Sequence, residues 1–237
     1  MEYPSTRFTF NVRLRYMGRS SKIPIAIVIG GVIIAGALYF SVPKLFPTTI
    51  EHSSLVRPVT TSDHILGNPA APAIIVVYCD FESAFCKDFD DTLHQIVANE
   101  GINGKVAVAY RAFPLSELHP NALSHARAAE CIAETGGNDA FWKFEEALFK
   151  NQPVEPTRYG TFASALGISG DAFAQCYVNA ATTVDAQIEA DRQNALDIGA
   201  NGAPYSLILV TGKPPLVMAG AYPYDAVQKL IDQALGN

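Results

Sequence analysis

A continuous apolar run, Ala73 to Tyr78, is the clearest element in the pattern of hydrophobic and polar positions. Such a run is typical of a strand covered on both faces, in the centre of a sheet flanked by helices. After Cys79 the apolar residues from Phe85 to Val97 fall on one helical face, and Gly101 ends that helix. A second short strand is predicted over Val106 to Tyr110. Together these segments predict a parallel β-α-β unit.

The middle of the chain has the pattern of consecutive helices, separated by Gly and Pro. The predicted helices cover Asn121–Glu134, Asp139–Lys150, Thr157–Leu166, Asp171–Ala180 and Thr183–Ile198. Strands return at Tyr205–Val210 and Leu216–Ala219 around a hairpin turn, and the last helix begins at Pro223. This order predicts an α/β fold, a mixed sheet with a helical insertion at about residues 116–200 between its β-α-β and β-β-α halves.

The N-terminal segment has a different character. Residues 1–22 carry five basic residues and one acidic residue, a net charge of 5 − 1 = +4. Residues 23–42 have no charged side chain and are long enough to cross a bilayer as one helix. We predict a cytoplasmic basic tail over 1–22, a single-pass cell-membrane anchor over 23–42, a linker over 43–62 and an extracytoplasmic domain over 63–237. The alternative is a cleaved signal peptide.

Charge and motifs exclude several function classes. The net charge is −6, so the part after the anchor carries −6 − 4 = −10, which argues against nucleic acid as a partner. No cofactor is expected, because the sequence has no Gly-rich phosphate loop and no Ser-His-Asp order. No metal site is expected from His119, His125 and Cys131, whose spacing does not place them on one helical face. The pairs Asp90-Asp91 and Glu145-Glu146 are interpreted as solvated helix faces.

The corner between the first strand and its helix carries the candidate chemistry. It reads Cys79-Asp80-Phe81-Glu82-Ser83-Ala84-Phe85-Cys86. Further motifs accompany it in the chain, namely Leu66-Gly67-Asn68-Pro69, Phe113-Pro114-Leu115 with His119-Pro120-Asn121-Ala122, and Gly202-Ala203-Pro204. Through these motifs residues 63–237 resemble the DsbA-type thiol-disulfide oxidoreductases of the thioredoxin-like superfamily, in particular membrane-anchored bacterial members. The resemblance implies a thioredoxin fold with a helical insertion.

The sequence departs from the family at the corner itself. The family motif is Cys-x-x-Cys, in which the first thiol attacks a substrate disulfide and the second resolves the mixed disulfide. Ser83 occupies the first position, so the ordinary cycle is not possible with Ser83 and Cys86 alone. The family also carries an acidic residue six positions before the first cysteine, and Val77 stands there. Both departures indicate changed chemistry.

The substrate side of the family pattern is retained. Pro204, preceded by Ala203, matches the family's cis-proline, which lies against the active-site cysteines and beside which a substrate strand pairs. The alternative is an ordinary loop proline. Phe81 and Phe85 are candidates for lining a peptide-binding groove, although core packing is the commoner role for aromatic residues at helical spacing.

The resemblance also bears on the four cysteines. It implies a structural disulfide between Cys131 and Cys176, closing a loop of about 45 residues, with two buried free thiols as the alternative. Cys79 is interpreted as a buried residue and Cys86 as a half-exposed single thiol of modest acidity. A redox pair of Cys79 with Cys86 is the alternative.

Two functional hypotheses follow. The preferred one is an anchored extracytoplasmic protein that exchanges thiols and disulfides with secreted or envelope proteins through Cys86, with Cys79 or an external thiol as partner and Ser83 and Pro204 beside them. The other is a redox-inactive module that binds extended polypeptides in a chaperone or assembly role. The expected partners are extracytoplasmic protein thiols or disulfides, a redox partner, and the membrane through the N-terminal helix.

Overall fold

A computed structural model describes residues 53–236 of the chain. The predicted basic tail, the predicted anchor and the first part of the linker lie outside the described residues. Within residues 53–236 we find no helix that is both long enough and apolar enough to span a membrane. The chain divides into two units, residues 1–46 and 47–237, and the described residues all belong to the second.

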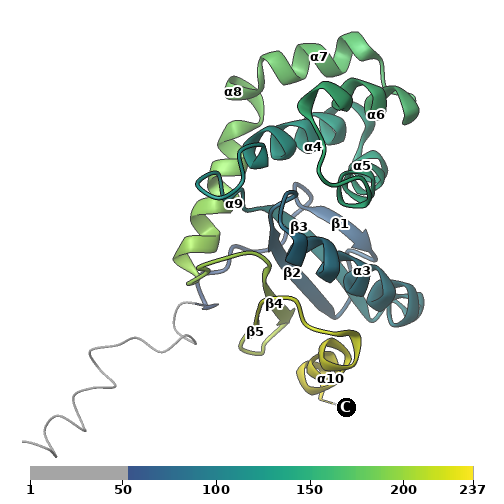
Figure 1. Cartoon of the computed structure of the whole chain (residues 1–237). Coiled ribbons are helices and arrows are strands. Elements are labelled where there is room, and N and C mark those ends of the chain that lie inside the picture. Colours follow the sequence, from purple (N-terminus) through teal and green to yellow (C-terminus); the bar gives the residue numbers. More distant parts are fainter. Residues whose placement is uncertain (1–52, 237) are drawn as a thin grey trace, which may run out of the picture. The chain divides into compact units, whose positions relative to one another are not determined.

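A five-stranded mixed sheet forms the centre of the domain (Figure 1). Its strands are β1 (His64–Gly67), β2 (Ala73–Cys79), β3 (Val106–Ala112), β4 (Tyr205–Val210) and β5 (Leu216–Ala219), in the spatial order β1-β3-β2-β4-β5. Strands β2 and β3 are parallel and the other neighbours are antiparallel. Every residue of β2 except Ile74 is buried, which explains its continuous apolar sequence.

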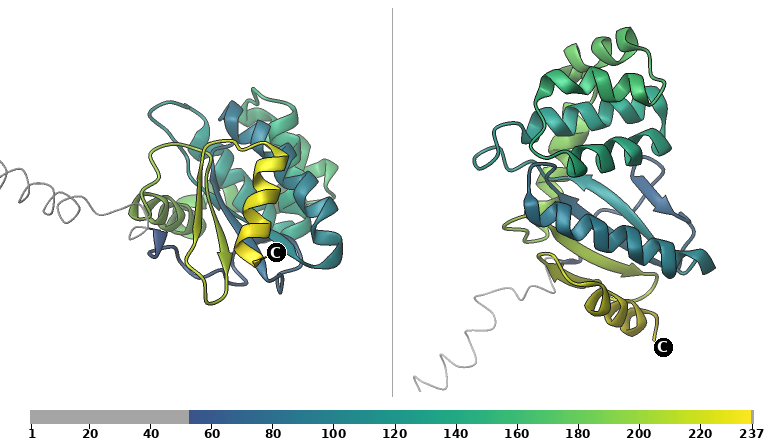
Figure 2. Two further views of the ribbon diagram at one scale, coloured as in Figure 1. Left: turned by 90° about the horizontal axis from the view of Figure 1, so that it is seen from below. Right: turned by 45° about the vertical axis from the view of Figure 1, so that its right-hand side comes forward.

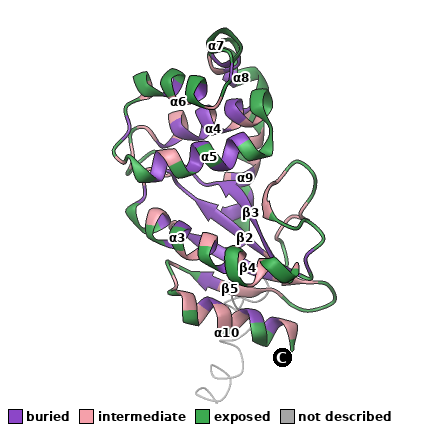
Figure 3. Ribbon diagram, turned by 90° about the vertical axis from the view of Figure 1, so that its right-hand side faces the viewer, coloured by how far each residue is buried: buried purple, intermediate pink, exposed green. Residues whose placement is uncertain are grey.

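Helices cover both faces of the sheet (Figure 2). Helices α3 (Ala84–Asn99) and α10 (Tyr224–Leu235) pack on one face, where alternate residues of β2 such as Ile75 and Val77 enter the larger core. Helix α9 (Asp185–Asp197) lies on the other face, against Val76 and Tyr78. Figure 3 shows the resulting pattern, with buried central strands and helices whose outer faces are exposed.

The helical insertion forms a layer at one end of the sheet (Figure 2). It contains α4 (Ala122–Gly136), α5 (Asn138–Lys150), α6 (Tyr159–Ala165), α7 (Gly170–Val178) and α8 (Ala180–Thr183). Two short 3-10 helices, η1 (Gly101–Asn103) and η2 (Pro156–Arg158), complete the described elements. A disulfide between Cys131 of α4 and Cys176 of α7 ties the layer together, the pairing that the resemblance implies.

The predicted thioredoxin-like α/β fold with a helical insertion is confirmed. The sequence pattern missed β1, because its three half-buried residues and one exposed residue at the sheet edge give no periodic signal. Residues 53–62, assigned to the linker by their composition, contact the domain. Arg57 forms an ion pair with Asp191, and Arg111 donates to the backbone carbonyls of Arg57 and Pro58, both at 3.1 Å.

Candidate active site

Local hydrogen bonds shape the corner between β2 and α3. Ser83 has extended backbone angles (φ −72°, ψ 122°) and is the N-cap of α3, where its Oγ accepts from the backbone N–H of Cys86 at 3.3 Å. Just before it, Asp80 Oδ1 accepts from the N–H of Glu82 at 2.8 Å. The helix therefore begins at Ala84, and Cys86 lies in its first turn.

Cys79 and Cys86 form a disulfide at this corner, with their Cα atoms 5.8 Å apart. Both residues are buried, Cys79 with 4% and Cys86 with 0% of its surface exposed. The prediction that Cys86 is a half-exposed single thiol is therefore wrong, and the alternative pairing with Cys79 is the one found. The end of a strand and the first turn of the next helix lie close enough in space to be bridged.

The surroundings of Cys86 favour a negative charge on its sulfur. The backbone N–H of Asp80 donates to Cys86 Sγ at 3.3 Å. The first turn of α3 adds the positive end of the helix dipole. Both effects stabilise a thiolate once the disulfide opens, so Cys86 is the better leaving group of the pair.

The proline loop meets the corner at Ser83. The peptide bond between Ala203 and Pro204 is cis, as the resemblance implies. Ser83 Oγ donates to the carbonyl oxygen of Ala203 at 3.4 Å. Ser83 is thus hydrogen-bonded both to Cys86 of the disulfide and to Ala203 of the proline loop.

The two aromatic candidates, Phe81 and Phe85, differ in burial. Phe81 is 2% exposed and stacks on Tyr110 with ring centroids 5.0 Å apart, so the prediction that it lines a surface groove is wrong. Phe85 is 67% exposed, so its core-packing alternative is wrong instead. A second exposed apolar residue, Leu118, belongs to the loop that Asp80 holds against the corner by accepting from the N–H of Leu115 at 2.7 Å.

A small cavity of about 10 Å³ lies behind the disulfide, with room for about one water molecule. It is lined by Val77, Cys79, Cys86, Asp90, Leu93, Tyr110, Trp142, Glu145 and Phe149. Asp90 and Glu145 are buried, so their interpretation as solvated residues is wrong. Burial raises the pKa of both carboxyl groups, and the facing Glu145 raises the pKa of Asp90 further. Carboxyl groups from α3 and α5 thus reach this cavity, to which β2 contributes the apolar Val77.

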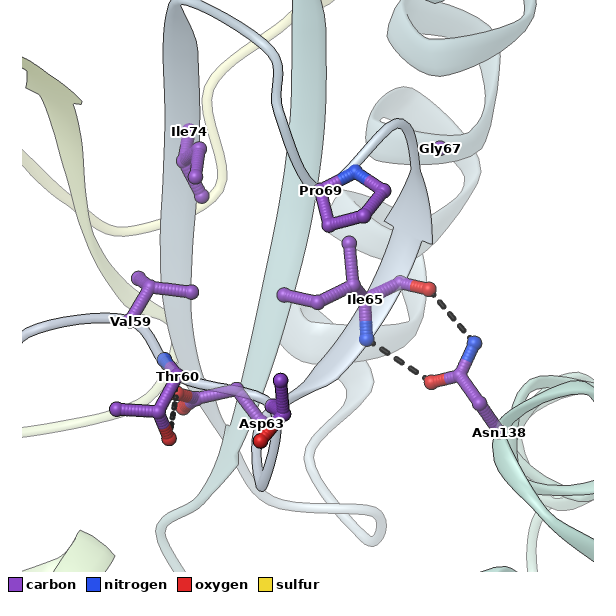
Figure 4. A pocket seen from close by; sticks show the side chains of 9 residues that line it. Val59, Thr60, Asp63, Ile65, Gly67, Pro69, Ile74 and Asn138 are labelled. Carbon is purple, nitrogen blue, oxygen red and sulfur yellow. Dashed lines mark hydrogen bonds between the residues drawn. The ribbon is translucent and has the colours of Figure 1, made fainter.

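A larger cavity of about 480 Å³ lies near Ile74, at the other end of β2 from Cys79 (Figure 4). Two of its polar residues, Asn138 and Asp63, make structural contacts. The Asn138 amide makes two hydrogen bonds with the backbone of Ile65, at 2.8 and 2.9 Å, and Asp63 accepts from Arg111 Nε at 2.7 Å. These hydrogen bonds hold β1 in place. Within the part of the chain that the structure describes, no cysteine lines this cavity, and it is not the candidate active site.

The predicted histidines have separate partners. His119 Nδ1 pairs with Asp80 at 2.9 Å, and His125 Nδ1 bonds the hydroxyl of Tyr159 in the insertion. Burial lowers the pKa of His125. Cys131 is held in its disulfide. These three residues do not converge, in line with their spacing.

The comparisons with known proteins decide the family. The family model described as Thioredoxin matches residues 59–233. The chain belongs to the thioredoxin family. Solved structures share its fold at low identity. The thiol-disulfide exchange protein α-DsbA2 of Wolbachia pipientis has a TM-score of 0.66 at 19% identity, covering 78% of this chain and 95% of its own. Oxidised BdbD of Bacillus subtilis has a TM-score of 0.66 at 22% identity, covering 76% and 97%.

Curated relatives of this thioredoxin-family chain are longer proteins. The Na(+)/H(+) antiporter NhaA 1 of Mycobacterium sp. (strain KMS) is 28% identical over 211 residues, which is 87% of this chain and 33% of the relative. That of Mycolicibacterium gilvum is 31% identical over 161 residues, which is 67% of this chain and 25% of the relative. The chain thus spans a third or less of the length of these proteins, and the similarity concerns one part of them.

Asp90 and Glu145 are the site residues of this thioredoxin-family domain that sequence reasoning missed. A signal for them exists in the helical periodicity. Asp90 lies four residues after Cys86 and three before Leu93, and both of these are buried. Glu145 likewise falls between Phe141 and Leu148 on the buried face of α5. A carboxyl group on an apolar face is the pattern that marks each of them.

Replacing Ser83 with Ala is expected to destabilise this thioredoxin-family domain by about 1 kcal/mol, because the N-cap acceptor for the Cys86 N–H is lost. Urea denaturation of the oxidised chain measures the change. Ser83→Thr keeps the hydroxyl and is the matched control. An equal loss in both variants would show that the side chain acts by packing and not as a cap.

Proposed function

We propose that the protein exchanges thiols and disulfides with other proteins through the Cys79–Cys86 pair. The observation that carries the proposal is this disulfide at the first turn of α3, beside the cis-Pro204 loop. Membership of the thioredoxin family supports it, as does a fold shared with a protein described as a thiol-disulfide exchange protein. This proposal replaces the single-thiol chemistry that the sequence predicts for Cys86, because Cys86 is bonded to Cys79.

The exchange step follows from the hydrogen bonds around Cys86. A substrate thiolate attacks Sγ of Cys79, the bond to Cys86 breaks, and Cys86 leaves as a thiolate stabilised by the Asp80 N–H. A second substrate thiolate attacks the substrate sulfur of the mixed disulfide, and Cys79 leaves in turn. The substrate is oxidised to a disulfide and the protein gains two electrons. The protons lost by the substrate thiols end on the two cysteines or in solvent.

The surface of the corner suits an extended polypeptide. The exposed side chains of Phe85 and Leu118 provide apolar contacts on the segments that border the disulfide. Ala203, partly exposed before the cis-Pro204 bond, offers backbone to a segment that adds as a strand. The substrates in this proposal are therefore protein thiols or disulfides in locally unfolded segments.

The proposed location is outside the cytoplasm. Two disulfides in 237 residues fit an oxidising compartment. The basic segment 1–22 followed by the uncharged stretch 23–42 supports a single-pass cell-membrane anchor with a cytoplasmic N-terminus. Under this arrangement the substrates are secreted or envelope proteins.

Equilibration with glutathione redox buffers tests the proposal. The full chain is equilibrated at graded ratios of reduced to oxidised glutathione, alkylated, and analysed by intact mass and peptide mapping. We expect the Cys79–Cys86 bond to open while Cys131–Cys176 stays closed, and we expect the chain to accelerate insulin reduction by dithiothreitol. A Cys79–Cys86 bond that opens only when the protein unfolds, together with unchanged insulin reduction, would overturn the proposal.

Burial of both sulfurs favours a second candidate function. A disulfide with 4% and 0% exposed residues can act as a structural cross-link, and the corner then binds extended polypeptides without redox chemistry. Reduced, carboxymethylated α-lactalbumin is a suitable unfolded probe because it has no free thiols. This candidate requires equal probe binding by the wild type and by Cys86→Ala, with no exchange activity in either. It fails if neither protein binds the probe.

A further inference from the structure

Three side chains beside the cavity behind the disulfide, those of Asp90, His94 and Glu145, point their ligand atoms toward one another. Asp90 and His94 lie one turn apart on α3, and Glu145 lies on α5. His94 Nε2 is 3.5 Å from Asp90 Oδ1 and 3.6 Å from Glu145 Oε2. One ligand atom from each of the three residues lies within 4.8 Å of the others. Sequence distance hides this group, because Glu145 belongs to the helical insertion.

Within residues 53–236, two of the three converging atoms have no hydrogen-bond partner, although the side chains of Asp90 and Glu145 also pair with each other. Among the described residues, His94 Nε2 and Glu145 Oε2 are both buried without a hydrogen-bond partner, and the Glu145 side chain is only 1% exposed. The distances from His94 Nε2 to the two carboxylate oxygens are longer than ordinary hydrogen bonds, which measure about 2.7–3.2 Å. They match the spacing of about 3.3–3.6 Å between ligands in a tetrahedral site with bonds of about 2.0–2.2 Å. The two distances from His94 therefore suit ligands of a common ion, and the two carboxylate ligand atoms lie within 4.8 Å of each other.

A cation at the same point would compensate the two carboxyl groups in their ionised form. Two adjacent buried carboxylates cannot both be ionised unless a positive charge compensates them. The residues that line the cavity behind the disulfide include no Lys or Arg. The outward neighbours, Asp91 and Glu146, are exposed and acidic, and the exposed Lys143 lines the opening beside His94 and not the cavity behind the disulfide. A divalent cation neutralises the pair directly.

We propose that Asp90, His94 and Glu145 bind one divalent transition-metal ion, with a fourth position left for water. A mixed carboxylate and imidazole set suits ions such as Zn²⁺ and Mn²⁺. The ion clamps α3, the helix that carries Cys86, onto α5 of the insertion. The site uses none of the residues that exchange disulfides.

The proposed site has a route to solvent. The His94 side chain is 35% exposed and lines an open cavity of about 330 Å³ together with Trp142, Lys143 and Glu146. An ion therefore reaches His94 from this side and meets the two buried carboxylates behind it.

Titration of the oxidised, metal-free full chain with Zn²⁺ tests the proposal. Both disulfides are closed in this form, so no thiolate competes for the ion. We expect one Zn²⁺ per chain by isothermal titration calorimetry and by native mass spectrometry. We also expect Zn²⁺ to raise the midpoint of thermal unfolding, since the ion binds only the folded chain. None of these readouts depends on disulfide exchange.

The chain supplies its own matched controls, because each buried acid has an exposed acidic neighbour. Asp90→Asn and Glu145→Gln are expected to weaken Zn²⁺ binding at least about tenfold, whereas Asp91→Asn and Glu146→Gln leave it unchanged. His64→Gln, which alters another His–Glu pair, is also expected to be neutral. The proposal is overturned if the wild type binds no Zn²⁺, or if the buried and exposed variants bind it equally. A proton shared by Asp90 and Glu145 would then neutralise the pair.

Discussion

Replacing Cys86 with Ala is expected to leave Cys79 able to form a stable mixed disulfide with glutathione, whereas Cys79→Ala is expected to form none. The reason is the asymmetry of the pair. In the disulfide, Cys86 Sγ accepts from the Asp80 N–H and sits at the positive end of α3, so Cys86 is the group that leaves and Cys79 is the sulfur that is attacked. In the single-cysteine variants, Cys79 keeps 4% of its surface exposed to glutathione, whereas Cys86 has no exposed surface. Both variants should lose acceleration of insulin reduction, falling to the uncatalysed rate.

Intact mass after incubation with oxidised glutathione distinguishes the two cysteines. One glutathione adduct on Cys79 is expected in Cys86→Ala, located by peptide mapping. The matched control is Cys131→Ser with Cys176→Ser, which leaves the corner unchanged and should keep its insulin activity. An adduct on Cys86 in Cys79→Ala, with none on Cys79 in the partner variant, would reverse the proposed order of attack.

Loss of the Cys131–Cys176 bond is expected to destabilise the folded chain by about 4 kcal/mol in the chain-entropy model. The bond spans 45 residues and joins α4 to α7, so its removal releases much of the insertion in the unfolded state. A loss of this size is a large part of the about 5–15 kcal/mol that stabilises a typical domain. Urea denaturation of the double Ser variant measures it.

The corner disulfide gives the comparison for this value. It spans only seven residues, so the same model assigns it about 2.5 kcal/mol. Cys79→Ser with Cys86→Ser should therefore cost clearly less than the double variant of the insertion. If the order of the two losses is reversed, chain entropy does not explain the stabilising effect of these bonds.

Sequence predicted the fold well because the core elements follow simple periods. The apolar run of β2 and the two C-terminal strands match the observed bounds to within one residue. The edge strand β1 was not predicted because it is short and mostly half-buried. The composition of residues 53–62 predicts a linker, but Arg57 of this segment forms an ion pair with Asp191. Nothing in the sequence indicates this contact, because the two residues lie more than a hundred positions apart.

The candidate site was predictable only in part. The positions of Ser83 and Pro204 followed from motifs, whereas the state of Cys86 depended on where the strand end lies in space. Phe81 and Phe85 illustrate the same limit. Both are aromatic corner residues, but Phe81 turns into the core and Phe85 projects from the first turn of α3. Residue type and spacing alone do not distinguish these two directions.

The strand position of Cys79 has a mechanical consequence. Its carbonyl oxygen accepts from the backbone N–H of Phe113 at 2.8 Å and from the hydroxyl of Tyr110 at 3.1 Å, so its main chain is anchored from two directions. Cys86 belongs instead to the first turn of a helix, a part that frays more readily than a central strand. When the disulfide opens, the anchored Cys79 is thus the cysteine that an incoming molecule contacts. The first turn of α3, which carries Cys86, takes up the resulting displacement.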